Sequence, residues 1–339
     1  MQRQQIERRR FLLSSMGLAA TGALGLRSAP AHAQMDAKAI AAYPEKPLRI
    51  VVPGPPGGGT DLLGRSLGVG MGKALGQQVL VDNKPGASGI IAAQNVLAQP
   101  ADGYTLYLGF TSMIQLPSLM PSIPVNFQKD FTPVSLMALG SDLFAVSAKL
   151  PAKSLAEFVA LAKQQPGKLS IGSYGNGTSS HLNGEQLKMR AGVDLIHVPY
   201  KGAAPMLTDL LGGQLDAAFV DQSTAFAHLK SDKIRFLACT GTENFRPLPE
   251  LKTLGQLGYP GFESHGFMGM FVATATPAPI VQRLSTVIAD QVRNGDAGKR
   301  LADMGMEPVG SAPDKLAALM ARDQPRWAKI VKDANVRLD

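Results

Sequence analysis

The chain has 339 residues, of which 45% are hydrophobic, 6% aromatic and 18% charged. This composition is typical of one or two globular domains with a sizeable core and argues against an extensively disordered chain. The formal net charge is +8, but five arginines and a single acid fall within the first 33 residues, so about half of the charge belongs to that segment. The remainder contains no dense run of Lys or Arg, which argues against nucleic acid as a partner.

Residues 1–33 are typical of a secretory signal peptide. A basic start is followed by the apolar run FLLSSMGLAATGALGL and by Ala31-His32-Ala33, the small-residue pattern that signal peptidase cleaves. The run is too short to span a bilayer. The stretch RRRFLL resembles a twin-arginine signal, although Glu7 and Leu13 depart from that pattern. We therefore expect export to the periplasm and cleavage after Ala33.

Strands and helices alternate in the first part of the chain. The sequence predicts a strand over 48–52, a Gly/Pro turn and a helix that ends near Gly76. Two similar units follow, with turns at 84–86 and 110–112. The long apolar stretch 131–148 then breaks this rhythm.

The alternation resumes after residue 150 and continues to the C-terminus. Strands are predicted within DLIHVPY, QLDAAFV, KIRFLACT and HGFMGMFVA and over 169–173, and helices near 154–165, 179–190, 223–230, 278–293, 296–304 and 313–334, with another after Lys201-Gly202. Alternating strands and helices indicate parallel sheets with right-handed crossovers. Cys239, the single cysteine, lies in an apolar strand, which predicts a small buried side chain and no internal disulfide.

Two long apolar strands divide this α/β pattern. The stretches 131–148 and 265–273 bracket a complete α/β set. This favours two α/β lobes joined by two crossing strands over the alternative, a single large doubly wound domain. Lobe 1 would then be discontinuous, formed by 45–141 plus 267–339, and lobe 2 would comprise 142–266.

Six junctions between a strand and a helix share one chemistry. They are PGPPGGGTD, NKPGASG, GFTS, SYGNGTSSH, PYKGAAP and FVDQST. Glycine permits close backbone approach, and the free N–H groups and dipole of a helix start favour an anion. The same residues are also ordinary turn formers and N-caps. Six such junctions, three in each predicted lobe, favour a ligand cleft beyond the carboxyl ends of the strands.

The junctions lack the marks of nucleotide binding or of catalysis. Gly54 to Gly59 has the spacing of a phosphate loop, but Thr60 and Asp61 occupy the positions that need Lys and a hydroxyl. None of the six junctions contains the G-x-S-x-G pattern of a nucleophile elbow. Ser179, Ser180 and His181 are adjacent, but neighbours on a helix point to different faces. The five histidines show no metal-ligand spacing. We therefore predict binding without reaction, cofactor or metal, with a secreted hydrolase using these residues as a less favoured alternative.

Several longer stretches indicate a family. VVPGPPGGGTD, DNKPGASG, ADGYTLYLG, KDFTPVSL, PGKLSIGSYGNGTSSHLNGEQLK, HVPYKGAAPMLTDLLGGQLDAAF and PLPELKTLGQLGYPGFE resemble the Bug-type substrate-binding proteins of tripartite tricarboxylate transporters. The resemblance extends from about residue 45 to the C-terminus. It implies a type II periplasmic-binding-protein fold whose lobes close on a small carboxylate: a di- or tricarboxylate, an acidic amino acid or an aromatic acid. We expect a monomer that delivers this ligand to membrane permease subunits; a carboxylate-sensing co-receptor for a sensor kinase is the alternative.

The resemblance also implies a site built from main-chain N–H groups and hydroxyls rather than from an arginine clamp. Matched residue by residue, it places at the site Pro55, Gly58, Thr60, Asp61, Gly86, Ala87, Thr111, Ser112, Tyr174, Gly175, Thr178, Ser179, His181, Tyr200, Lys201, Gly202 and Asp221. The two aspartates would bind waters, an ammonium or a ligand hydroxyl, or bond across the lobes. The family pattern differs at FTSMIQLPSLM, Val220 and Ser223, so the resemblance does not identify the ligand. Phe110, Met113 and Phe267 would suit an aromatic or less polar acid.

Overall fold

A computed structural model describes residues 37–338. The export signal expected at residues 1–33 lies outside this range. Within it, none of the helices combines the length and the hydropathy that crossing a bilayer requires. Three short elements belong to this part of the chain without forming its main layers: α1 (Ala37–Ala42), the single 3-10 turn η1 (Ala87–Gly89) and α5 (Phe127–Asp130).

The first sheet contains six strands among the described residues, in the order β11-β4-β10-β3-β1-β2. Their bounds are β1 (Leu48–Val52), β2 (Val79–Asn83), β3 (Thr105–Phe110), β4 (Phe131–Gly140), β10 (Gly266–Ala273) and β11 (Glu307–Pro308). The units predicted near the N-terminus give parallel strands β1, β2 and β3. Strand β10 runs antiparallel to β3 and β4, and β11 runs antiparallel to β4. The parallel pairing expected from the alternation holds for β1, β2 and β3, while β4, β10 and β11 make the sheet mixed.

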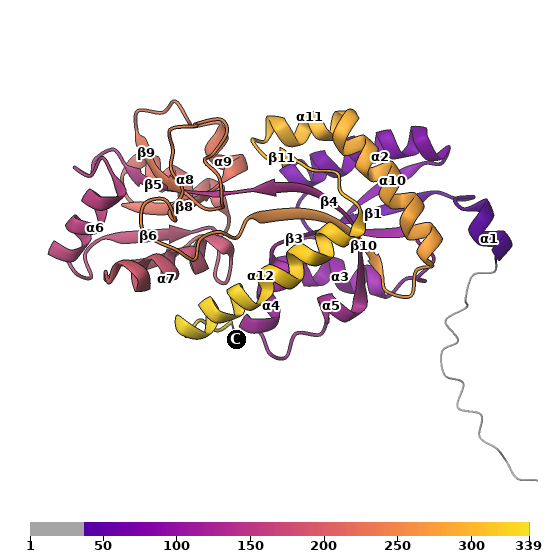
Figure 1. Cartoon of the computed structure of the whole chain (residues 1–339), viewed down its shortest axis with the longest axis horizontal. Helices are drawn as coiled ribbons and strands as arrows, with labels where there is room; N and C mark the ends of the chain where they lie inside the picture. The colour runs from indigo at the N-terminus through magenta and orange to yellow at the C-terminus, as the bar shows by residue number, and fades with distance from the viewer. Residues whose placement is uncertain (1–36, 339) are drawn as a thin grey trace, which may run out of the picture. The chain divides into compact units, whose positions relative to one another are not determined.

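Helices cover both faces of this sheet, as Figure 1 shows. One face carries α2 (Gly59–Leu75), α10 (Ala278–Asn294) and α11 (Asp296–Asp303), and the other carries α3 (Ile90–Leu97), α4 (Ser112–Leu119) and α12 (Pro313–Asp333). Burial from both sides explains why LRIVV and TLYLGF are continuous apolar runs instead of alternating ones. This sheet and its helices are called lobe 1 below.

The second sheet has the order β7-β6-β8-β5-β9 among the described strands. Its bounds are β5 (Asp142–Ser147), β6 (Ser170–Ser173), β7 (Ile196–Pro199), β8 (Ala217–Asp221) and β9 (Ile234–Cys239). Strands β6, β7 and β8 are parallel, whereas β5 runs antiparallel to β8 and β9. One face packs on α6 (Leu155–Gln164) and α7 (Ser179–Ala191), and the other on α8 (Ala203–Gly212) and α9 (Gln222–Phe226). This sheet and its helices are called lobe 2.

Aromatic side chains form the centre of lobe 2. The Phe144 ring lies 5.1 Å from the ring centroids of both Phe158 and Phe219, and all three side chains are fully buried. Cys239 is buried as well, as predicted, and carries a free thiol. Lobe 2 therefore has a core of its own, built on the neighbouring strands β5 and β8.

The chain passes between the sheets at Ser141. Strand β4 ends at Gly140 in the first sheet and β5 begins at Asp142 in the second, so the predicted strand 131–148 is two strands. The strand predicted at 265–273 forms β10, which pairs with β3 and β4 of lobe 1. Leu254 and Phe262 still pack in the core of lobe 2, so the chain returns to lobe 1 just before Gly266 rather than along β10. Gly140 and Gly266 are register partners, which brings the two passages together.

Candidate ligand-binding site

A cavity of about 340 Å³ is lined by residues of both lobes. Of the residues that the family resemblance places at the site, the structure brings together Thr60, Thr111, Ser112, Tyr174, Thr178, Ser179, Gly202 and Asp221. The cavity lining does not include Pro55, Gly58, Asp61, Gly86, Ala87, Gly175, His181, Tyr200 and Lys201. The strand–helix junctions thus contribute their helix starts to the cavity more than their preceding loops.

Asp61 and Tyr200, which lie outside the cavity lining, form hydrogen bonds within their own lobes. The buried Asp61 carboxylate accepts hydrogen bonds from Arg65 and from the Gly57 amide, at 3.0 and 2.9 Å. The Arg65 guanidinium is the main reason that the pKa of Asp61 is lowered to about 2. Tyr200 donates its hydroxyl to Asp209 at 2.8 Å. Both acids stabilise their own lobe, and Asp61 holds the glycine-rich turn before α2.

The start of helix α7 lies at the cavity, where Thr178 and Ser179 belong to the lining. Its N-cap residue, Thr178, does not cap the helix, because its hydroxyl donates instead to the Gly175 carbonyl at 2.6 Å. The N–H groups of residues 179–181 find no acceptor among the described residues. Helices α4 and α8 likewise lack a side-chain cap at Thr111 and Gly202. Three helix starts at one cavity are suited to bind an anion.

Some of the predicted hydroxyls are engaged within the protein. The Thr111 hydroxyl accepts the Phe267 amide at 2.9 Å, and Ser112 donates to the Ser88 carbonyl at 2.9 Å. Ser179 accepts a hydrogen bond from Gln115 Nε2 at 2.9 Å, which joins α4 of lobe 1 to α7 of lobe 2. The Ser179 hydroxyl also interacts with Tyr174. Main-chain amides are therefore more accessible to a ligand than the hydroxyls of Thr111 and Ser112.

Two carboxylates form part of the cavity wall. Asp142 and Asp221 are register partners on the antiparallel strands β5 and β8, so their side chains lie on the same face. Asp142 accepts the Tyr174 hydroxyl at 3.2 Å and the Asn183 amide at 2.9 Å. Burial, together with the neighbouring charge of Asp221, raises the pKa of Asp142 to about 7. Within the described residues, neither acid has an ion-pair partner.

Sequence reasoning missed Gln115 and Asp142. Gln115 lies one helical turn after Ser112, on the same face of α4. A helix predicted to begin at the third junction would therefore have placed Gln115 beside Ser112. Asp142 is a polar residue at the centre of the apolar stretch 131–148, but only the strand register places it opposite Asp221. The apolar part of the lining includes Phe110 and Phe267, whereas Met113 is buried in the core of lobe 1.

Residues 63–336 match the family described as the tripartite tricarboxylate transporter family receptor. The chain belongs to this family. It is 32% identical to Protein BugT of Bordetella pertussis over 298 residues, which cover 87% of this chain and 91% of BugT. It is 33% identical to a UPF0065 protein of Pseudomonas sp. strain P51, from the tcbD-tcbE intergenic region, over 91% of this chain and 92% of that protein.

Solved structures of receptors with the same fold agree with this assignment. An R. palustris protein solved with adipate is 33% identical, with a TM-score of 0.78 over 87% of this chain and 99% of that one. MatC of Rhodopseudomonas palustris with bound malate is 30% identical, with a TM-score of 0.74 over 85% and 100%. The periplasmic binding protein BugD is 32% identical, with a TM-score of 0.75 over 87% and 99%. The Bug-type resemblance and the two-lobed α/β fold are thereby confirmed, and these relatives are solute-binding proteins, not enzymes.

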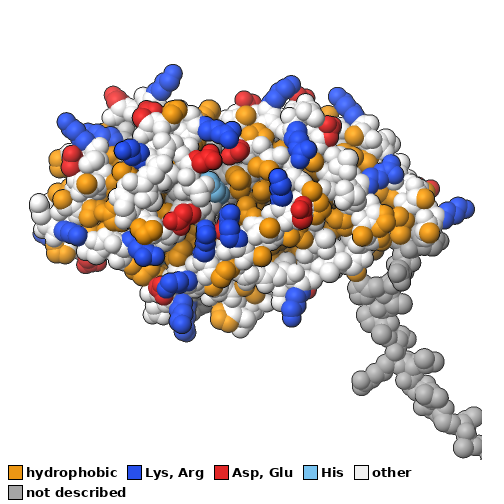
Figure 2. Space-filling model, viewed as in Figure 1, with side chains coloured by type: hydrophobic (Ala, Val, Ile, Leu, Met, Phe, Trp, Pro, Cys, Tyr) orange, Lys and Arg blue, Asp and Glu red, His pale blue; other side chains and the backbone are white. Residues whose placement is uncertain are grey.

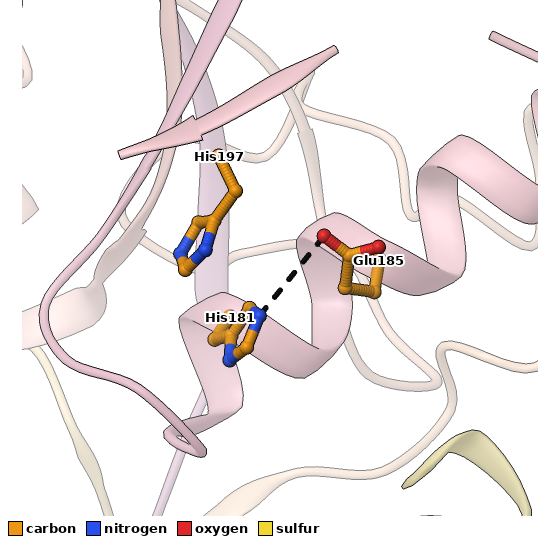
Figure 3. Close-up of side chains that lie close together, drawn as sticks. All are labelled: His181, Glu185 and His197. Carbon is orange, nitrogen blue, oxygen red and sulfur yellow. Dashed lines mark ion pairs between the residues drawn. The ribbon is translucent and has the colours of Figure 1, made fainter. Parts of the chain in front are cut away.

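His181 lies outside the cavity lining and supports a loop that belongs to it. Its Nδ1 accepts the Gly177 amide at 3.0 Å, and Gly177 is part of the cavity lining. The ring stacks on His197 with a centroid distance of 4.0 Å, and its Nε2 lies 4.0 Å from Glu185 (Figure 3). Burial is the main cause that lowers the pKa of His181 to about 4. The neutral imidazole thus holds the glycine loop rather than acting as a base toward Ser179.

His181, Glu185 and His197 also lie close enough to suggest a metal ion. The hydrogen bonds argue against one. Because His181 Nδ1 accepts from Gly177, the proton of the neutral ring is on Nε2, the nitrogen that faces Glu185. A metal on that nitrogen would require the Gly177 hydrogen bond to break. Glu185 is in addition paired with Lys188 at 2.9 Å. These contacts favour a structural role for the three residues.

Proposed function

We propose that the protein is a periplasmic receptor that binds a small carboxylate and delivers it to the membrane permease of a tripartite tricarboxylate transporter. The observation that carries this proposal is the uncapped start of α7, whose first residue, Ser179, lines a cavity between the lobes. No lysine or arginine of the described chain lines that cavity, so peptide dipoles would have to hold the anion. Adipate and malate, seen with two structural relatives, are carboxylates of suitable size.

Ligand binding would couple the two lobes. The cavity takes residues such as Ser112 and Phe267 from lobe 1 and Tyr174 and Ser179 from lobe 2. A ligand that touches both lobes binds the closed arrangement more tightly and so favours it. Micromolar affinity requires about 8 kcal/mol, which a few charge-assisted hydrogen bonds in a desolvated cavity supply. We propose Gly140, Ser141 and Gly266 as the hinge.

The amide of residue 179 gives a direct test of anion binding. Proline is well tolerated at the first position of a helix, and Thr178 already has the extended backbone (φ −77°, ψ 166°) that precedes proline. Ser179→Pro should therefore leave the fold intact but remove one N–H donor. We expect carboxylate affinity, measured by calorimetry, to fall about 10- to 100-fold, as for the loss of a hydrogen bond to a charged group.

Ser179→Ala is the matched control for this change. It also removes the hydroxyl and its hydrogen bond to Gln115 but retains the N–H group. We expect it to weaken binding several-fold less than Ser179→Pro does. Equal losses in the two variants would mean that the helix start does not hold the carboxylate, and would contradict the proposed mode of binding.

Deletion of the gene tests delivery to a permease. We expect a deletion strain to lose high-affinity uptake of the ligand, and re-expression of the full chain to restore it. The alternative role, a co-receptor for a sensor kinase, leads to the opposite result. In that case uptake would persist in the deletion strain and only the ligand-dependent induction of other genes would be lost.

Charges on the outer surface give a further indication about the partner. Figure 2 shows Lys and Arg side chains interspersed with Asp and Glu over the visible face. A polyanion needs a contiguous basic patch, and this face does not offer one. The visible face therefore suits a partner with mixed charge, as expected for a protein subunit.

A further inference from the structure

The cavity wall formed by Asp142 and Asp221 restricts which carboxylate fits. Two acids at register partners repel each other unless a positive group or a shared proton separates them. Both residues belong to the cavity lining, and no lysine or arginine of the described chain lines it. A ligand with two or three carboxylates would add negative charge next to this pair.

The two acids still have capacity to accept hydrogen bonds. Asp221 Oδ1 accepts from Ser223 and from the Thr224 amide at 3.0 Å, while Oδ2 makes no hydrogen bond to any described residue. The Asp142 carboxylate receives two neutral donors, Tyr174 and Asn183, and no charged one. Burial and the neighbouring charge of Asp221 raise the pKa of Asp142. The pair is therefore suited to accept hydrogen bonds from an ammonium group.

The remaining wall suits an apolar ligand body between charged ends. Phe110, Leu116, Phe267, Met268 and Met306 line the same cavity as the acids and the start of α7. Tyr174 donates to Asp142 and also interacts with Ser179, so the acid pair and the helix start are neighbours. A ligand carboxylate at the start of α7 and a ligand cation bound by the two acids would thus both lie next to Tyr174.

From this arrangement we infer that the receptor selects a zwitterion, a monocarboxylate that carries an ammonium group on an apolar body, over dicarboxylates of the same size. The inference rests on the proposed function, since it assigns the ligand class of the same cavity. The ligand carboxylate binds the amides at the start of α7. The ammonium group binds Asp221 and Asp142.

Five probes that share a short chain separate these cases: hexanoate, norleucine, aminocaproate, butylmalonate and adipate. Norleucine and aminocaproate add an ammonium group at either end of the hexanoate chain, whereas butylmalonate and adipate carry a second carboxylate there. Calorimetry on the purified chain should show that at least one amino acid binds about 10- to 100-fold more tightly than hexanoate, the range for a hydrogen bond between charged groups. That amino acid should also bind more tightly than its matching diacid, which is butylmalonate for norleucine and adipate for aminocaproate.

Asp221→Asn tests the residues behind this preference. Asparagine caps a helix start as well as aspartate does, so the N-cap of α9 is retained. We expect the variant to lose about tenfold or more of its affinity for the amino acid and to bind the diacid more tightly. Asp209→Asn is the matched control, because Asp209 lies in lobe 2 but outside the cavity lining, and it should leave both affinities unchanged.

Three results would overturn the inference. A diacid could be the tightest of the five probes, Asp221→Asn could leave the preference unchanged, or none of the five could bind while other carboxylates do; in each case carboxylate binding itself stands. If no carboxylate of any kind shifts the melting temperature of the purified chain, the proposed function fails together with the inference. The two failures are therefore distinguishable.

Discussion

Asp142→Asn is expected to stabilise the unliganded protein at pH 8. The Asp142 pKa is about 7 in the folded protein and 3.8 in the absence of the fold, so the unfolded chain loses this proton at lower pH than the folded one. The carboxyl group therefore costs folding free energy progressively as the pH rises from about 4 to about 7, and the full cost remains above pH 7. Asparagine does not ionise and keeps an oxygen for the Asn183 amide. We expect a gain on the order of 2–4 kcal/mol in the free energy of unfolding.

Urea denaturation at pH 4 and at pH 8 measures this effect. The relevant quantity is the difference between the variant and the unsubstituted protein, because other groups that titrate are common to both. We expect this difference to be near zero at pH 4 and large at pH 8. Asp209→Asn, which removes a carboxylate of lobe 2 outside the cavity lining, is the control substitution. If the stability difference between the variant and the parent protein is no larger at pH 8 than at pH 4, the fold does not disfavour the charged form of Asp142.

Phe144→Ala is expected to lower the free energy of unfolding by about 3–5 kcal/mol, the usual cost of emptying a fully buried aromatic site. The ring contacts Phe158 and Phe219 at the centre of lobe 2, and the cavity left behind cannot close without moving β5. Urea denaturation with tryptophan or circular-dichroism detection measures the loss. Because Asp142 begins the same strand, we also expect weaker ligand binding.

Two substitutions calibrate this result. Phe144→Leu retains most of the side-chain volume and should cost less than half as much as Phe144→Ala. Val69→Ala changes a side chain that is 61% exposed and should stay within about 0.5 kcal/mol of the parent protein. If Phe144→Ala costs no more than Val69→Ala, the packing around β5 is not the core of this lobe.

Helices were predicted from the sequence more accurately than strand direction. The C-terminal helices expected near 278–293, 296–304 and 313–334 are present as α10, α11 and α12, because each has a regular apolar face and a clear start. The antiparallel direction of β5 and β10 was not predicted. Apolar runs identify strands that are buried on both faces, but they carry no information about the direction of the neighbouring strand.

The candidate site shows the same contrast between features that are local in the sequence and features that depend on distant contacts. Hydroxyl and glycine residues at the strand–helix junctions identified Ser179, Thr178 and Gly202, since a helix start is a local feature of the sequence. Asp142 and Gln115 were missed because their roles depend on contacts with Asp221 and Ser179, which are distant in the chain. The family resemblance placed Asp61 and His181 at the site, but local hydrogen bonds engage them with Arg65 and Gly177.

The pairing of Gly140 with Gly266 has a mechanical consequence. With the proposed hinge at Gly140, Ser141 and Gly266, both connections between the lobes lie at this residue pair, and we expect the lobes to rotate about it. Both residues are glycine and add no side chain of their own, while Met306 and Gln222 lie against Gly140. The proposed hinge would thus bend at a few backbone torsions, and ligand binding would not have to break the pairing between strands.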